Sequence, residues 1–174
     1  MNPSPPLQSL LSSHDRPETT PSIALNHSSI SLYEQDFLLW LEETAAKLRA
    51  GDFAQIDLEN LIEEVESLGR SQRRELSSRL IRLLEHLLKR LYVNLPQDYR
   101  GWEQTIRHQR LEITLLLQDS PSLKTLWIER FESAWDTALK TVRQDYPDVS
   151  FPDRWPHGTT VETLLQQNFW HHTP

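Results

Sequence analysis

The stretch from Leu58 to Leu91 places apolar residues at helical spacing along most of its length. Its first part carries the apolar set Leu58, Leu61, Ile62, Val65 and Leu68. Its second part carries Leu76, Leu80, Ile81, Leu83, Leu84, Leu87, Leu88 and Leu91. Apolar residues three or four positions apart share one face of an α-helix, so both parts predict helix. The second apolar stripe covers about 160° of the helix surface, which predicts a central helix that touches several neighbours.

Gly69 divides this stretch into two predicted helices. Asp57 fits the N-cap of the first helix, and Gly69 fits a left-handed residue directly after its end. Ser71 then fits the N-cap of the second helix. We therefore expect an antiparallel helical hairpin with its turn at Gly69.

Charge separates the two halves of the predicted hairpin. Residues 52–69 hold six acidic residues and no lysine or arginine, whereas residues 70–110 hold ten basic and four acidic residues. Adjacent helices of opposite charge can pair, although each exposed ion pair contributes only about 0–1 kcal/mol. This pairing would neutralise the basic run at Arg70, Arg73 and Arg74. Nucleic-acid binding through Arg70–Arg74 is therefore kept only as a third alternative.

The composition favours a single all-α domain in a reducing compartment. The chain has 174 residues, four glycines and no cysteine. That length suits one domain, and the lack of cysteine excludes disulfides and thiol chemistry. No apolar run approaches the about 20 residues of a membrane-spanning helix, and the N-terminus lacks the pattern of a secretory signal. We therefore predict a cytoplasmic protein with no membrane partner.

Proline and glycine divide the rest of the chain into segments. Residues 1–30 hold five of the eleven prolines and few large apolar side chains, which predicts a disordered arm. Residues 31–170 are predicted as one helical domain, and residues 171–174 as a frayed tail. Ser31 and Glu34 have the spacing of a capping box at the start of the first helix, which Gly51 ends.

The second half of the chain predicts two more long helices and an irregular end. After a loop that contains Pro96 and Gly101, one helix spans about residues 102–117, and the next begins at Pro121 and ends near Tyr146.

The segment around Trp155 is rich in proline and aromatic residues. It is predicted to lie across the bundle, with Trp155 and Trp170 holding it in place, and the alternative is that either tryptophan serves as a binding anchor. Thr159 and Glu162 then give a capping box for a short last helix. The fold class is thus all-α, a single bundle of about five main helices with this extended segment and the short helix.

These segments resemble, in order, the all-helical domain-of-unknown-function family numbered twenty-nine, which is common in cyanobacteria. The matching segments are Leu32–Phe37 with Trp40, Leu48–Phe53, Asp57 with Glu63–Ser71, His86–Lys89, Trp102 with Ile106, Gln109 and Arg110, and Asp119–Leu123. The resemblance covers about residues 31–170. The chain departs from the family pattern in two places, at Gly101 before Trp102 and at Arg90-Leu91 after Lys89. The resemblance implies a helical fold and brings no established activity, cofactor or catalytic residue.

One polar cluster is the candidate binding site. If the hairpin forms, the acidic helix brings carboxylates close to basic residues at the border of the leucine stripe. The members of the predicted cluster are Glu63, Glu64, Glu66, Arg79, His86 and Arg110. We favour a structural role for this network in fixing helix register, and a pocket with a perturbed histidine is the functional alternative.

Signatures of catalysis and of metal binding are missing from the sequence. His108 and Glu112 share a helix face, but the chain has no Glu-x-x-His pair and no His-Glu-x-x-His pattern. No serine lies in a Gly-x-Ser-x-Gly elbow, and no glycine-rich phosphate loop is present. We therefore predict no metal, no cofactor and no catalytic residue.

The predicted role is an interaction with another protein, and the identity of that protein is open. Amphipathic helices and an acidic face support this role, and it fits the lack of catalytic motifs. The alternatives are an enzyme or a ligand or metal sensor with a polar inter-helical pocket, followed by nucleic-acid binding. Self-association of the chain is left open.

Overall fold

The computed structural model describes residues 31–170, all of whose secondary structure is helical. No strand occurs within this described range, so the prediction of an all-α fold is confirmed. The predicted arm over residues 1–30 and the predicted tail over 171–174 lie outside the described residues. The chain divides at Gly51 into two compact units, described separately below. The prediction of one domain over residues 31–170 stays a prediction.

The first unit contains α1 (Leu32–Gln35) and α2 (Phe37–Ala50). The capping box at Ser31 and Glu34 is confirmed, because each residue's side chain accepts a hydrogen bond from the other's backbone N–H, both at 3.3 Å. A single helix up to Gly51 was expected, but Asp36 interrupts it. The backbone of Asp36 is extended, and its side chain caps α2 by accepting a hydrogen bond from the Leu39 N–H at 3.0 Å. Gly51 ends α2, as predicted, and its backbone lies in the left-handed region.

In the second unit, residues 58–92 form one helix, and the hairpin prediction is wrong. Helix α3 (Leu58–Tyr92) has 35 residues and is about 52 Å long at 1.5 Å per residue. Asp57 caps it as predicted, accepting a hydrogen bond from the Asn60 N–H at 3.3 Å. Gly69 lies inside the helix, because a glycine there costs only about 0.5–1 kcal/mol and strong helix formers follow it. The acidic and basic halves are therefore consecutive along one helix.

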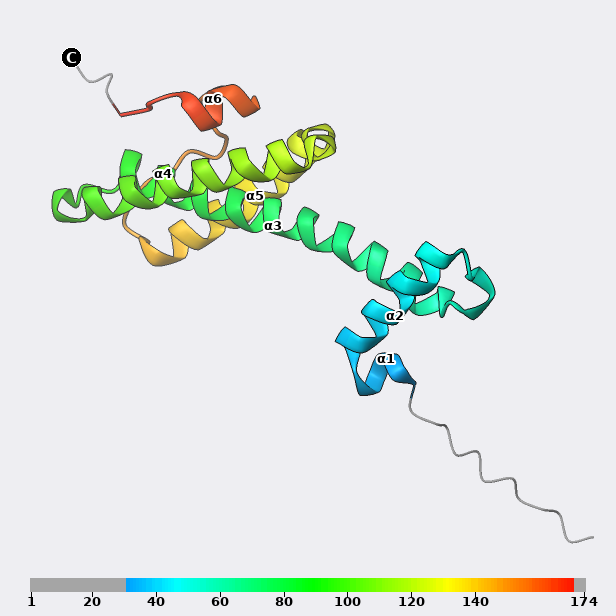
Figure 1. Cartoon of the computed structure of the whole chain (residues 1–174). Helices are drawn as coiled ribbons and strands as arrows, with labels where there is room; N and C mark the ends of the chain where they lie inside the picture. The colour runs from blue at the N-terminus through cyan, green and yellow to red at the C-terminus, as the bar shows by residue number, and fades with distance from the viewer. Residues whose placement is uncertain (1–30, 171–174) are drawn as a thin grey trace, which may run out of the picture. The chain divides into compact units, whose positions relative to one another are not determined.

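The core is a bundle of α3, α4 (Pro96–Asp119) and α5 (Trp127–Asp145). The later part of α3 is the central helix, as the width of its leucine stripe predicted. Its six fully buried leucines are Leu76, Leu80, Leu83, Leu84, Leu87 and Leu88. Figure 1 shows that α4 and α5 lie along this part of α3, whereas the first turns of α3 extend beyond them.

Two predicted boundaries of the bundle helices are corrected. Helix α4 begins at Pro96 and includes Gly101, so the predicted loop shrinks to the residues just after Tyr92. Proline at the first helical position costs nothing because the N–H that it lacks has no partner inside the helix. Pro121 begins a 3-10 helix (Pro121–Leu126), and the regular α5 begins only at Trp127.

The C-terminal segment packs against the bundle through aromatic rings. The Trp155 ring lies 5.7 Å from Trp135 and 5.4 Å from Phe169, centroid to centroid, in edge-to-face geometry. This contact confirms that Trp155 holds the segment in place. Helix α6 (Val161–Gln166) follows, and its cap is Thr160 where Thr159 was expected. Within residues 31–170, every helix is too short or too polar to cross a membrane.

The continuous α3 gives a test at two glycines. Gly69→Ala should raise the free energy of unfolding by about 0.5–1 kcal/mol, because alanine is the better residue inside a helix. A Cβ at Gly69 would approach only the Arg73 guanidinium, at 3.5 Å or more. Gly51→Ala should instead lower stability by about 1–2 kcal/mol, because Gly51 has a φ of 76°. Urea denaturation followed by circular dichroism measures both changes. Destabilisation by Gly69→Ala would contradict a continuous helix.

Candidate functional site

The predicted polar cluster is not assembled as a whole. Glu66 and Arg79 are thirteen residues apart in one helix, which separates them by about 20 Å along its axis. Glu63 and Glu64 lie further still from Arg79. Arg79 instead donates to Glu75, one turn earlier, and bridges to Glu112 of α4 at 2.9 Å. The predicted acidic partners therefore stand apart from the basic members of the cluster.

His86 is held by its own helix. Its Nδ1 lies 2.8 Å from the Arg82 carbonyl oxygen, so the ring donates this hydrogen bond from Nδ1. Burial lowers the pKa of His86, and the nearby charges of Lys89 and Arg82 lower it further, although the Arg82 hydrogen bond acts in the opposite direction. A neutral imidazole that is hydrogen-bonded to the backbone of its own helix fits a structural role for His86 in packing.

Arg110 ties the C-terminal segment to α4. Its Nη2 donates to the Gln167 carbonyl oxygen at 2.6 Å, and its guanidinium lies 5.6 Å from the centre of the Phe169 ring. Burial lowers the pKa of Arg110. The neighbouring Gln109 is buried although it is polar. Both residues thus belong to the packing of α4.

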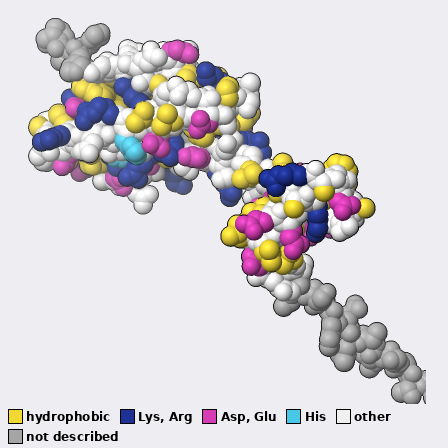
Figure 2. All heavy atoms as spheres, viewed as in Figure 1, with side chains coloured by type: hydrophobic (Ala, Val, Ile, Leu, Met, Phe, Trp, Pro, Cys, Tyr) yellow, Lys and Arg dark blue, Asp and Glu magenta, His cyan; other side chains and the backbone are white. Residues whose placement is uncertain are grey.

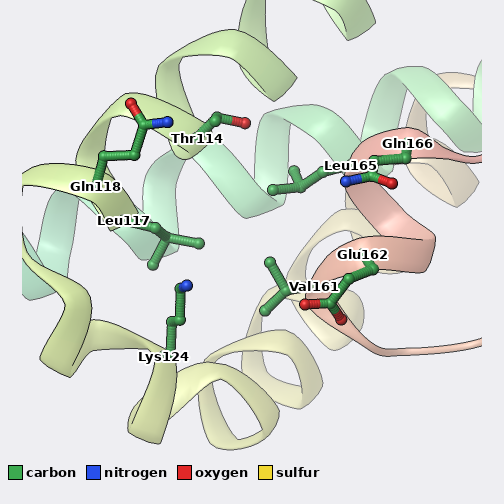
Figure 3. A pocket seen from close by; sticks show the side chains of 8 residues that line it. All are labelled: Thr114, Leu117, Gln118, Lys124, Val161, Glu162, Leu165 and Gln166. Carbon is green, nitrogen blue, oxygen red and sulfur yellow. The ribbon is translucent and has the colours of Figure 1, made fainter.

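A small pocket opens where α4 meets α6. Figure 3 shows its lining residues, with Lys124 and Glu162 on separate walls and Leu117, Val161 and Leu165 forming the apolar part. Its volume is about 230 Å³. Pockets for drug-sized ligands generally hold about 300–1,000 Å³, so this pocket is smaller than that range.

No group of three or more potential metal ligands occurs among residues 31–170. The predicted pair of His108 and Glu112 is used differently, because Glu112 binds Arg79. On the face of the bundle that Figure 2 displays, acidic and basic side chains lie intermixed. That face therefore carries no extended area of one sign.

The first turns of α3 expose a row of large apolar side chains, which we call the α3 apolar face. Its members are Leu58, Ile62, Val65 and Leu68, exposed by 60%, 51%, 61% and 69%. The sequence pattern correctly placed these residues on one side of a helix. It missed their exposure, because spacing alone does not distinguish a side that packs in the core from one that meets solvent.

Carboxylates border the α3 apolar face. Glu64 and Glu66 are the neighbours of Val65 in sequence, so they project about 100° to either side of it. Glu66 pairs with Arg70 at 3.2 Å on the exposed surface. Glu59 and Glu63 are exposed and form no ion pair within the described range. The face is thus an apolar stripe inside an acidic border.

Comparison with known proteins identifies the family of the chain. No curated protein and no solved structure matches the chain significantly. The model of the family described as "Domain of unknown function DUF29" matches residues 32–170, which is most of the chain and all but the first of the described residues. The chain therefore belongs to the DUF29 family, as the order of its sequence segments predicted.

Proposed function

We propose that this protein acts by binding another protein through the α3 apolar face. One observation carries the proposal: four large apolar side chains, each more than half exposed, share one side of a helix. Contiguous exposed apolar patches with polar rims are typical of interaction sites. Because only 51–69% of each of these four side chains is exposed, covering them would contribute on the order of 4–7 kcal/mol, at about 1.5–3 kcal/mol for a side chain that passes from fully exposed to fully buried.

The length of the α3 apolar face also favours a helical partner. Leu58 and Leu68 are ten residues apart, so the stripe is about 15 Å long, or about three turns. Amphipathic helices bind such stripes through anchors at i, i+3, i+4 and i+7. We further infer that the interaction takes place in the cytoplasm of a bacterium; the cysteine-free composition supports the reducing compartment.

The alternatives have less support from side-chain positions. A polar pocket around Glu63, His86 and Arg110 lacks its acidic member, because Glu63 lies 23 residues before His86 in the same helix. Nucleic-acid binding through Arg70–Arg74 has less support because Arg70, the first arginine of this run, is paired with Glu66. The α3 apolar face is therefore a better supported candidate site than either of these two arrangements.

Site-specific photocrosslinking tests the proposal. A photoreactive residue replaces Val65 in the full chain, expressed in its native cells, and the same residue replaces Leu111 as the matched control. Leu111 is exposed by 55% on α4, similar to Val65. We expect a protein adduct from position 65 at many times the yield from position 111. Leu68→Asp in the same chain should abolish the adduct while the circular dichroism spectrum stays unchanged. Equal yields at the two positions, or no adduct, would overturn the proposal.

A further inference from the structure

We propose that the occupant of the α3 apolar face is a basic amphipathic helix of a different protein, an inference that rests on the proposed function. The segment that carries the face is acidic up to Gly69, after which Arg70 and Arg73 follow. Residues 52–69 contain six acidic residues and no lysine or arginine. A partner that covers the apolar stripe therefore meets carboxylates along its edges, and lysine or arginine at the matching positions of the partner would complement them.

Two of these carboxylates border the centre of the face. Glu64 and Glu66 flank Val65, and a helix seated on Val65 would have its own edges over them. The Arg70 partner of Glu66 lies one turn toward the bundle, and both side chains of this pair are about half exposed or more. Such an exposed pair is weak, so Glu66 keeps attraction for a second cation. In the partner, apolar anchors would pack on the stripe, and basic residues beside those anchors would pair with the carboxylates at its border.

The same charges disfavour a second copy of this chain. In an in-register parallel pair of α3 helices, Glu64 of one copy would lie on the same side of the interface as Glu66 of the other copy. In an antiparallel pair centred on Val65, Glu64 would face Glu64 of the other copy on one side of the interface, and Glu66 would face Glu66 on the other. Like charges placed opposite each other lower affinity. The basic residues that begin at Arg70 would reach only the ends of either pair, so a partner of the opposite sign fits better.

A matched pair of synthetic peptides tests the inference on the full-length protein. Both are fluorescently labelled peptides that span about three helical turns, held helical by the same side-chain cross-link and with leucine at the same anchor positions. One carries lysine and the other glutamate at every flanking position. At about 0.1 M salt, fluorescence anisotropy should give a Kd for the lysine peptide at least tenfold below that of the glutamate peptide. The ratio should shrink toward one near 1 M salt, where the Debye length falls to about 3 Å.

Variants separate this site from general attraction to an acidic protein. Glu64→Gln with Glu66→Gln should raise the Kd of the lysine peptide at least fivefold. Glu132→Gln with Asp136→Asn removes the same charge from exposed positions of α5 and should change it less than twofold. Ile62→Ser with Val65→Ser should abolish binding of both peptides. Circular dichroism confirms that each variant remains helical.

Several outcomes would overturn the inference. They are equal affinity for the two peptides, binding of neither peptide, coverage of the face by another part of the same chain, or an equal effect of the α5 variant. A photocrosslinked adduct that contains only a second copy would overturn it as well. An adduct with a different protein, combined with no preference for the lysine peptide, would leave the proposed function standing and remove only the basic character of the partner. Absence of any adduct would remove the proposed function itself.

Discussion

Replacing Leu84 by alanine should lower the free energy of unfolding by about 2–5 kcal/mol. Leu84 lies in the later part of α3 and has no exposed surface. The truncation removes apolar contacts on a helix that α4 and α5 both contact, and it leaves a cavity. Because alanine favours helix at least as well as leucine does, the loss reports packing and not helix propensity.

Urea denaturation, followed by circular dichroism, measures the effect of Leu84→Ala. Leu68→Ala is the matched control, because it makes the same truncation in the same helix at a residue that is 69% exposed. The control should shift the free energy of unfolding by no more than about 0.5 kcal/mol. Similar losses for the two variants would show that the first turns of α3 are buried as deeply as the bundle.

Trp127→Ala should destabilise the protein by about 3–5 kcal/mol. Trp127 is the first residue of α5 and is 3% exposed, and its indole N–H donates to the Thr159 carbonyl oxygen at 2.7 Å. The residue therefore fills the core and fastens the segment that precedes α6. Trp127→Phe keeps most of the ring but leaves the Thr159 carbonyl without this donor, which costs about 1–3 kcal/mol.

The two Trp127 variants are compared by thermal and urea unfolding, together with limited proteolysis of the C-terminal segment. Trp127→Phe should fall between the wild type and Trp127→Ala in stability. It should already speed cleavage near Thr159, because the segment has lost a hydrogen bond. Wild-type stability for Trp127→Ala would contradict the assignment of this side chain to the core.

Features set by local geometry were predictable from the sequence. The spacing of the leucines between Leu76 and Leu88 predicted that they share one side of the helix, because the period of an α-helix alone decides which residues share a side, and the structure buries all six of these leucines. The capping box at Ser31 and the helix end at Gly51 were predictable for the same reason, since each depends only on adjacent residues.

Features that depend on competition between two local structures, or on contacts between residues far apart in sequence, were not predictable. Gly69 is acceptable both after a helix and within one, and only the rest of the fold decides between these states. The ion pair between Arg79 and Glu112 joins α3 to α4, so its partners depend on how the two helices align. The family membership was predictable because it rests on an ordered series of segments. The candidate site was not, because exposure depends on which helices cover α3.

The continuity of α3 has a consequence for the energetics of recognition. An isolated helix of about three turns is barely stable in water, because its first turn is difficult to nucleate. The turns that carry the α3 apolar face continue a helix whose later turns are held in the core, so nucleation has already occurred. These turns are therefore already helical when a partner arrives, so less binding free energy is lost to ordering them.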